Sequence, residues 1–233
     1  MCGRYRLSRR KQLIQEYFDT ADEVDWEPRY NIAPTQTVFV IRQDAREPVR
    51  LASLMRWGLV PNWAKDATIG PRMINARAET EAEKPAFKEL LQRRRCLIPA
   101  DGFYEWQKTG KSKQPYCFEM VQREPFAFAG LWDGWRTPDG AMLETCTILT
   151  TKPNQLLAEI HDRMPVILPP ASYDLWLDPG FRDLAATSEM LKPYDGGQMR
   201  RYAVSPKVNN VANDDLQCSQ PIEVSQAIQA GLF

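Results

Sequence analysis

The sequence has no apolar run near the ~20 residues that a bilayer-spanning helix needs, and its start lacks the basic and then apolar build of a signal peptide. Its 233 residues carry 30 basic and 30 acidic side chains. The chain is therefore no bulk polycation, and any nucleic-acid site must be a local basic patch. We expect a cytoplasmic protein without membrane contact.

Cysteine is sparse, and its pattern excludes two classes of protein. The five cysteines are odd in number and widely spaced, and no CxxC pair occurs; they are Cys2, Cys96, Cys117, Cys146 and Cys218. This pattern indicates neither a disulfide framework nor a zinc site, so we expect no metal and no cofactor. Three of them, Cys96, Cys117 and Cys146, lie in apolar, strand-like stretches and are expected in the core.

The order of the predicted elements indicates the fold class. Strand-like runs mostly follow one another without regular helical crossovers, which favours an α+β fold. We predict a single domain over residues 1–213, with an antiparallel, barrel-like β core flanked by short helices, and a polar C-terminal tail over residues 214–233. No repeat or low-complexity linker divides the chain.

Three predicted elements carry or adjoin the candidate site residues discussed below. Ser8 is expected to cap a helix whose apolar face carries Leu13, Ile14, Tyr17 and Phe18. Phe103–Gln107 and Tyr116–Val121 read as an antiparallel hairpin joined through residues 108–111. Asn154 is expected to cap a short helix that ends near His161.

Cys2 directly follows the initiator methionine. Its small side chain permits removal of Met1, which leaves one residue with a free α-amine and a thiol. Their ordinary pKa values, about 7.7–8.0 and 8.5, keep both groups usable near neutral pH. Such an aminothiol condenses with an aldehyde to an imine, and the sulfur then closes a thiazolidine ring. The alternative is a small apolar residue near a disordered terminus.

Two ionisable side chains are candidates for proton transfer. His161, the only histidine, follows a predicted helix end and stands beside Asp162 and Arg163. Glu105 lies between Tyr104 and Trp106 in an otherwise apolar strand. It either belongs to a solvated strand face or is a partly buried carboxylate whose pKa is raised enough for acid or base catalysis.

Polar pairs two residues apart share one face of an extended chain. Asn75 and Arg77 form such a pair, which combines an amide with a guanidinium suited to phosphate. Arg4 and Arg6 stand in the same relation near Cys2. Each of these residues alone would be an ordinary surface residue. Trp63, flanked by Asn62 and Lys65, is the least core-like of the tryptophans and a candidate to stack on a base.

Six ordered motifs together resemble the SRAP (SOS response-associated peptidase) family. They are Cys2–Arg4, Trp57–Pro61, Ile74–Thr80, Arg95–Trp106, Ile160–Pro165, and Val204–Ser205 with Val208–Asn210. The resemblance covers Cys2 to Asn210. One motif alone would be weak, but their joint order is specific.

The resemblance implies a sensor of abasic sites in single-stranded DNA that forms a covalent thiazolidine crosslink. It implies that Cys2 is the nucleophile, that Asn75 holds the sugar and amine, that Glu105 is the acid or base, and that His161 assists sugar ring opening. It also implies DNA contacts for Arg4 and Arg77, with Thr150 as a polar group near the site. Some members carry two adjacent tryptophans where this chain has Trp63 and Ala64, so the aromatic cover over the lesion is expected to be smaller.

Single-stranded DNA with an abasic site is the expected partner of a monomeric protein, with replication-fork proteins as further partners. Lyase activity, crosslink reversal and self-processing are expected secondary reactions. Three other functions stay open. Glutaminase domains also begin Met-Cys-Gly, which allows an N-terminal-nucleophile amidohydrolase. A cysteine peptidase could use Cys2 and His161, and a non-covalent single-strand binding module would release its DNA on denaturation.

Overall fold

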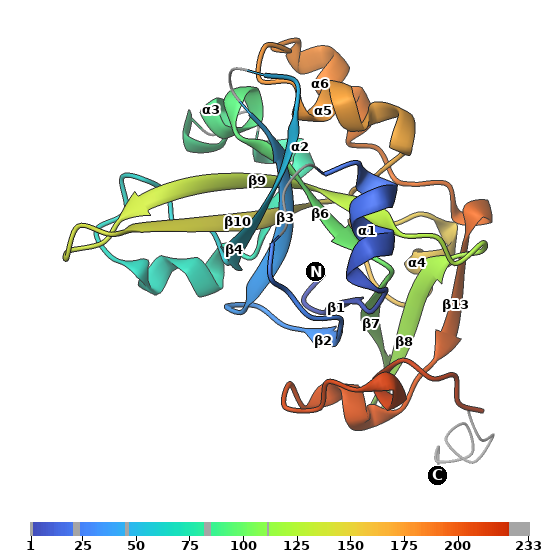
Figure 1. Ribbon diagram of the computed structural model, residues 1–233. Helices are drawn as coiled ribbons and strands as arrows, with labels where there is room; N and C mark the ends of the chain where they lie inside the picture. The colour runs from blue at the N-terminus through green and yellow to red at the C-terminus, as the bar shows by residue number, and fades with distance from the viewer. Residues whose placement is uncertain (1, 21–23, 45–46, 82–84, 111, 224–233) are drawn as a thin grey trace.

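The structure is a computed structural model that describes residues 2–20, 24–44, 47–81, 85–110 and 112–223 (Figure 1). The strands are β1 (Tyr5–Leu7), β2 (Arg29–Ile32), β3 (Thr37–Gln43), β4 (Arg50–Trp57), β5 (Asn75–Arg77), β6 (Arg95–Ala100), β7 (Gly102–Thr109), β8 (Ser112–Met120), β9 (Phe126–Arg136), β10 (Met142–Thr151), β11 (Met164–Pro165), β12 (Ile167–Leu168) and β13 (Met199–Ala203). The α-helices are α1 (Lys11–Phe18), α2 (Ala78–Glu81), α3 (Pro85–Arg93), α4 (Gln155–Ala158), α5 (Tyr173–Leu177) and α6 (Leu184–Met190). The 3₁₀ turns are η1 (Ala67–Arg72), η2 (Pro170–Ser172), η3 (Gly196–Gln198), η4 (Pro206–Asn209) and η5 (Leu216–Cys218).

A closed ring of strands forms the centre of the molecule (Figure 1). β10 pairs with β4, β4 with β3, β3 with β6, β6 with β9, and β9 again with β10. Closure removes the exposed edges that an open sheet would present. The predicted α+β fold with a barrel-like core is confirmed. Its pairings are mostly antiparallel, but β10 runs parallel to both β4 and β5.

A second sheet packs against this barrel, with strand order β13-β8-β7-β1-β2. Aromatic side chains join the two layers: the Phe103 and Phe128 rings lie 6.0 Å apart, and the Tyr5 and Trp57 rings 5.4 Å apart. Alternation along β7 then aims Phe103 and Glu105 at the barrel and Tyr104 at the opposite side. The face of the second sheet that packs on the barrel is called the inner face, and the other the outer face.

The predicted hairpin is confirmed, with Phe103 opposite Phe118 and Glu105 opposite Tyr116. Its strands are longer than expected, and Lys111 of the predicted connection lies outside the described residues. Asn154 caps α4 as predicted, because its Oδ1 accepts the Leu157 N–H at 3.0 Å. These two elements deliver Glu105 and His161 to the site.

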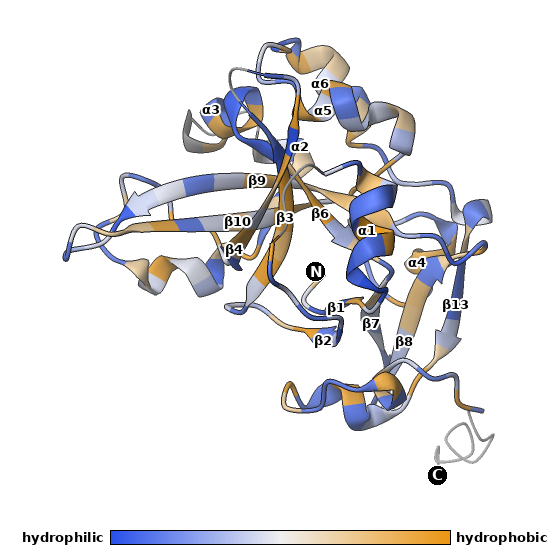
Figure 2. Ribbon diagram, viewed as in Figure 1, coloured by the Kyte–Doolittle hydropathy of each residue, from blue (hydrophilic) through white to orange (hydrophobic). Residues whose placement is uncertain are grey.

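The predicted start of the first helix is wrong. Arg10, not Ser8, precedes α1. Ser8 donates through its backbone N–H (2.7 Å) and hydroxyl to the buried Asp101 carboxylate instead. Only Ile14 and Phe18 of the expected apolar face are buried, since the short helix presents one narrow stripe to the core (Figure 2).

The segment after Asp214 is not a free tail as far as the structure describes it. The Asp214 carboxylate accepts the Tyr30 and Asn31 N–H groups, at 2.6 and 2.8 Å. Cys218 is fully buried against the outer face, and Pro221 bridges to Val204. The boundary predicted at Asp214 therefore coincides with no break in packing, and residues 224–233 lie outside the described part. No helix in the described chain combines the length and apolar character needed to cross a bilayer.

Candidate functional site

Cys2 is completely buried in the core, three residues before β1 begins. β1 pairs with β7 so that Tyr5 lies opposite Phe103, and the Tyr104 N–H donates to the Arg4 carbonyl at 2.9 Å. Continuing this register brings Cys2 and Gly3 beside Glu105. Burial raises the pKa of the Cys2 thiol far above its usual range, and the Glu105 charge raises it further. The thiol therefore stays protonated at neutral pH.

Glu105 is 3% exposed, so the interpretation as part of a solvated strand face is wrong. It lies on the inner face two residues after Phe103, where the barrel excludes water. Burial raises the pKa of Glu105 to about 8. A carboxyl group that remains largely protonated at neutral pH can serve as a general acid.

His161 faces Glu105, with its Nε2 4.0 Å from the Glu105 Oε2. The His161 Nδ1 lies 3.0 Å from the Arg163 backbone N–H and 3.2 Å from the Arg163 carbonyl, so either tautomer of the neutral ring has a partner there. The tautomer that carries its proton on Nδ1 leaves Nε2 free to accept one. The exposed Asp162 carboxylate lies 3.1 Å from Nδ1 and can stabilise the imidazolium. Burial lowers the pKa of His161, so the ring is mostly neutral at pH 7. The structure thus links Cys2, Glu105 and His161.

Among the described residues, Asn75 is connected to Cys2, Glu105 and His161 only through other residues. It lies on β5, where its Nδ2 donates to the Ile148 carbonyl at 3.4 Å. Two residues further along β10, Thr150 accepts hydrogen bonds from Arg163 at its carbonyl and hydroxyl, at 2.6 and 3.2 Å. The buried Asn75 Oδ1 has no hydrogen-bond partner in the described part of the chain. A buried acceptor left open in this way suits a donor on a bound ligand.

A cavity of about 360 Å³ opens above Glu105 and His161. Its other lining residues are Trp106, Lys108, Lys113 and Asn209. The Trp106 Nε1 donates to Asn209 at 2.7 Å, which fixes that wall. Lys108 and Lys113 are directly opposite each other on β7 and β8. Like charges in this position destabilise a strand pair unless an anion lies between them.

The sequence interpretation missed this pair of lysines. Their signal was the hairpin register: once Glu105 pairs with Tyr116, the two lysines must face each other at the end of the same strands. It also gave no role to Arg163, which holds Glu79 through two hydrogen bonds of 2.7 and 2.9 Å. Arg163 fixes the backbone that orients the His161 ring.

The predicted DNA contacts occupy different environments. Trp63 is 61% exposed, and Arg77 is exposed two residues after Asn75. Thr150 is fully buried, and its hydroxyl donates to the Ala76 carbonyl at 3.3 Å. These observations do not test DNA contact, which stays a prediction for all of them.

Arg4, the fourth predicted DNA contact, is held inside the protein. Its Nη1 donates to the Asn31 Oδ1 at 2.8 Å and to the Val208 carbonyl at 2.7 Å. Its guanidinium also lies 5.8 Å from the centre of the Trp106 ring. Arg4 therefore ties the start of β1 to the C-terminal segment. Within the described residues, no group of three or more His, Cys, Asp or Glu side chains could hold a metal ion.

Known proteins resemble this chain over nearly its whole length. The abasic site processing protein YoqW of Bacillus subtilis (strain 168) is 47% identical over 218 residues, which cover 92% of this chain and 96% of that protein. The abasic site processing protein HMCES of Gallus gallus is 31% identical, with 96% of this chain and 79% of that protein covered.

Solved structures share the fold. A crystal structure of a protein from Bacteroides thetaiotaomicron superposes with a TM-score of 0.86 at 27% identity, covering 95% of this chain and all of that one. A protein from Bordetella bronchiseptica gives a TM-score of 0.72, also at 27% identity, with 88% of this chain and all of that one covered. The family described as SOS response associated peptidase (SRAP) matches residues 1–211. The chain belongs to the SRAP family.

Proposed function

We propose that this protein captures abasic sites in single-stranded DNA as a covalent thiazolidine, through Cys2 freed of Met1. The names of its relatives support abasic sites as the substrate. The observation that carries the covalent step is the position of buried Cys2 beside Glu105, which lines one cavity together with His161. These residues match the requirements of an aminothiol that must meet a sugar aldehyde.

The proposed reaction begins with the closed form of the abasic sugar, which hides its aldehyde. Neutral His161 takes the proton of the C1′ hydroxyl and returns one to the ring oxygen, which opens the sugar. The Cys2 α-amine then adds to C1′ to give a carbinolamine. The open Asn75 Oδ1 accepts a hydrogen bond from the amine or a sugar hydroxyl.

Glu105 then acts twice. As an acid it protonates the carbinolamine hydroxyl, which leaves as water and gives an iminium. As a carboxylate it takes the thiol proton while sulfur bonds to C1′ and closes the ring. The balance is one aldehyde and one aminothiol giving one thiazolidine and one water. The Glu105 pKa of about 8 allows this carboxyl group to act as acid in the first step and as base in the second near neutral pH.

The buried thiol favours this reaction over a cysteine peptidase. A peptidase nucleophile needs a thiol whose pKa is lowered by a nearby cation. Burial raises the pKa of Cys2 instead, and any negative charge on Glu105 raises it further. A protonated thiol is a weak nucleophile, so it attacks only after the more reactive iminium has formed. Reversal of ring closure and strand cleavage from the same iminium are the secondary reactions of this proposal.

DNA is held by local charges, since the chain as a whole is neutral. Lys108 and Lys113 at the cavity are suited to a phosphate beside the lesion. Arg77 is exposed near Asn75 and suits a second phosphate, and Trp63 offers an exposed ring to a base. Arg4 and Thr150 would support the site from within.

The deciding experiment incubates the protein with single-stranded DNA that carries one abasic site, followed by denaturing electrophoresis. We expect a heat-stable complex with wild type and none with Cys2→Ala. Cys2→Ser and Cys2→Ala both keep the α-amine but lack the thiol, so each should be trapped only when borohydride reduces the imine. DNA with a tetrahydrofuran analogue, which has no aldehyde, is the control. A stable complex with Cys2→Ala, or with protein that mass spectrometry finds to retain Met1, would refute the proposal.

A further inference from the structure

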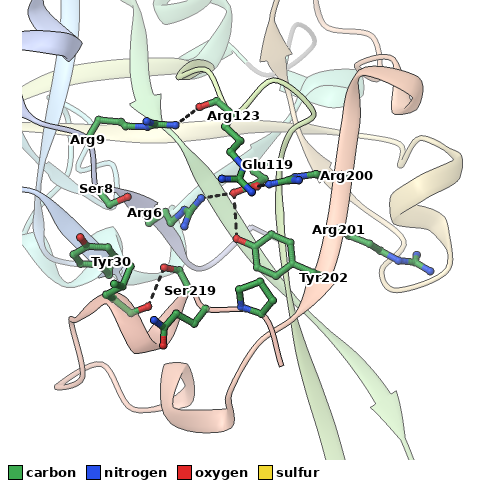
Figure 3. Close-up of a pocket in the computed structure, with 13 residues that line it drawn as sticks. Arg6, Ser8, Arg9, Tyr30, Glu119, Arg123, Arg200, Arg201, Tyr202 and Ser219 are labelled. Carbon is green, nitrogen blue, oxygen red and sulfur yellow. Dashed lines mark hydrogen bonds and ion pairs between the residues drawn. The ribbon is translucent and has the colours of Figure 1, made fainter. Parts of the chain in front are cut away.

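A second cavity, of about 550 Å³, lies on the outer face of the second sheet (Figure 3). It is bounded by β8, β13, the turn that follows β8, and the C-terminal segment. Its lining residues include five arginines, namely Arg6, Arg9, Arg123, Arg200 and Arg201. Glu105 projects from the inner face of the same sheet, and the two cavities share no lining residue.

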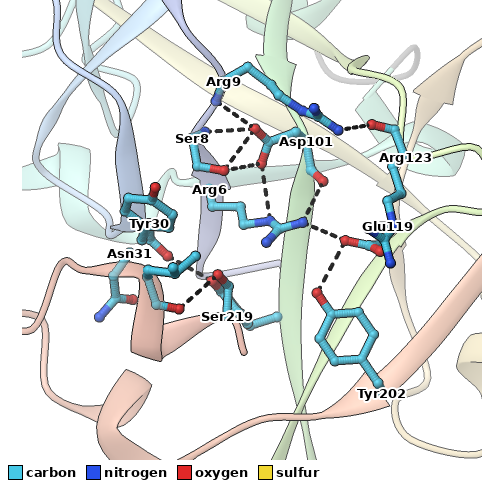
Figure 4. Close-up of polar contacts among 12 residues, drawn as sticks. Arg6, Ser8, Arg9, Tyr30, Asn31, Asp101, Glu119, Arg123, Tyr202 and Ser219 are labelled. Atoms are coloured by element: carbon cyan, nitrogen blue, oxygen red, sulfur yellow. Dashed lines mark hydrogen bonds and ion pairs between the residues drawn. The ribbon is translucent and has the colours of Figure 1, made fainter. Parts of the chain in front are cut away.

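The two carboxylates at this cavity are fully engaged (Figure 4). Glu119 accepts hydrogen bonds from Arg6 at 2.5 Å, from the Arg200 Nε at 2.8 Å and from the Tyr202 hydroxyl at 3.1 Å. Asp101 lies 3.0 Å from the Arg6 Nε and also accepts the backbone N–H groups at the start of the α1 segment. These contacts fix the guanidinium groups before any ligand arrives.

Positive charge nevertheless exceeds negative charge here. Arg201 is paired with Glu159 and turns away from the others in Figure 3. Two carboxylates then face four guanidiniums, so two positive charges lack a partner carboxylate. The carboxylates are Asp101 and Glu119, and the guanidiniums are those of Arg6, Arg9, Arg123 and Arg200.

Arg9 and Arg123 carry this surplus. The Arg9 guanidinium donates to the Arg123 carbonyl, which holds the two residues together. Arg123 has a φ of 60°, a left-handed conformation that is uncommon outside glycine. In the described chain no hydrogen bond or ion pair of the Arg123 guanidinium is found. The Arg9 and Arg123 side chains both line the cavity, so an anion bound there is attracted by both charges.

We propose that this outer cavity binds the phosphate of a nucleotide. Arginine forks suit phosphate, which accepts two parallel hydrogen bonds from one guanidinium. A volume of 550 Å³ is larger than a phosphate needs and falls in the range of sites for whole small molecules. Tyr30, Tyr202 and Pro221 supply apolar surface for the attached nucleoside. The nucleotide comes either from solution or from a nucleic acid strand.

The test measures binding of three probes by titration calorimetry: inorganic phosphate, thymidine 5′-monophosphate and an oligothymidylate without any lesion. Arg9→Gln and Arg123→Gln remove the surplus charge without breaking a buried pair, whereas a change at Arg200 would disturb Glu119. Arg136→Gln, at an exposed arginine on the β9–β10 hairpin, is the matched control. Arg123→Lys keeps the charge if the glutamine variant folds poorly.

Each arginine removed should weaken binding about tenfold or more, because a charge-assisted hydrogen bond to the phosphate is removed with it. Arg136→Gln should bind as wild type does. Binding of the monophosphate indicates a free nucleotide as the source. The oligothymidylate also meets the proposed DNA contacts around the first cavity, so only the part of its affinity that Arg9→Gln and Arg123→Gln remove indicates a strand at the outer cavity. Crosslinking at saturating DNA should be unchanged in Arg9→Gln and Arg123→Gln, so this site and the proposed reaction fail separately. If no probe binds, or if the Arg9→Gln/Arg123→Gln protein binds as well as wild type, the inference is overturned.

Discussion

Glu105 and Glu119 are both buried on the β7–β8 hairpin, at 3% and 4% exposed, but they project from opposite faces of the sheet. Glu119 meets two guanidiniums and a tyrosine hydroxyl. Glu105 meets an imidazole 4.0 Å away, and burial raises its pKa to about 8. A buried carboxylate compensated by fixed cations holds the fold together. Burial without such cations raises the pKa of Glu105, so this carboxyl group can gain and lose a proton near neutral pH.

The comparison is tested most strongly by exchanging each carboxylate for its amide. Glu105→Gln should lower the single-turnover rate of crosslink formation about 10²–10⁴-fold, since the acid is lost. Glu119→Gln should leave that rate near the wild-type value. Denaturing gels of timed samples give both rates. Equal losses in the two variants would show that burial alone, and not the surroundings, matters.

Stability should respond in the opposite way. Glu119→Gln leaves Arg6, whose side chain is only 13% exposed, without half of its compensation. We expect the free energy of unfolding to fall by about 3–5 kcal/mol. Glu144→Gln breaks the partly exposed pair with Arg42 and should cost less than about 1 kcal/mol. Urea denaturation of both variants measures the difference, and a Glu119→Gln loss as small as the control's would contradict this assignment.

The pH dependence of stability should reveal the raised pKa of Glu105. The folded-state pKa of Glu105 is about 8, above its ordinary value of 4.5, so the folded state binds this proton more tightly. Stability should therefore decrease as pH rises from 4.5 to 8, by at most about 5 kcal/mol. Glu105→Gln should remove this part of the decrease and be the more stable protein at pH 8. Urea unfolding at pH 5 and pH 8 tests it, and parallel curves for the two proteins would argue against a raised pKa.

The smallest effect is expected at the two lysines that line the cavity above Glu105 and His161. Lys108→Gln and Lys113→Gln should each weaken capture of single-stranded DNA a few-fold at low salt. The slope of log affinity against log salt should fall by about 0.7 for each phosphate that the variant no longer neutralises. Lys192→Gln, at an exposed lysine of the α6 end, is the control. Fluorescence anisotropy measures the slopes, and slopes equal to wild type would exclude these lysines from the DNA interface.

Local patterns in the sequence were enough for several parts of the site. Asn154 was predicted as a cap because its side chain acts within three residues, and the hairpin followed from alternation and a polar turn. Ser8 was predicted wrongly because its hydroxyl is bound by Asp101, 93 residues away. A local rule cannot anticipate a competing partner that only the fold brings near.

The sequence by itself determined the chemistry on offer: an aminothiol at Cys2, one imidazole at His161, and a carboxylate within an apolar strand. Tertiary structure decided which face of the sheet Glu105 joins, how Arg4 and the segment after Asp214 are held, and where the surplus arginine charge gathers. The reason is physical. Reactivity is a property of a side chain, but its pKa and partners depend on water exclusion and charges supplied by distant strands.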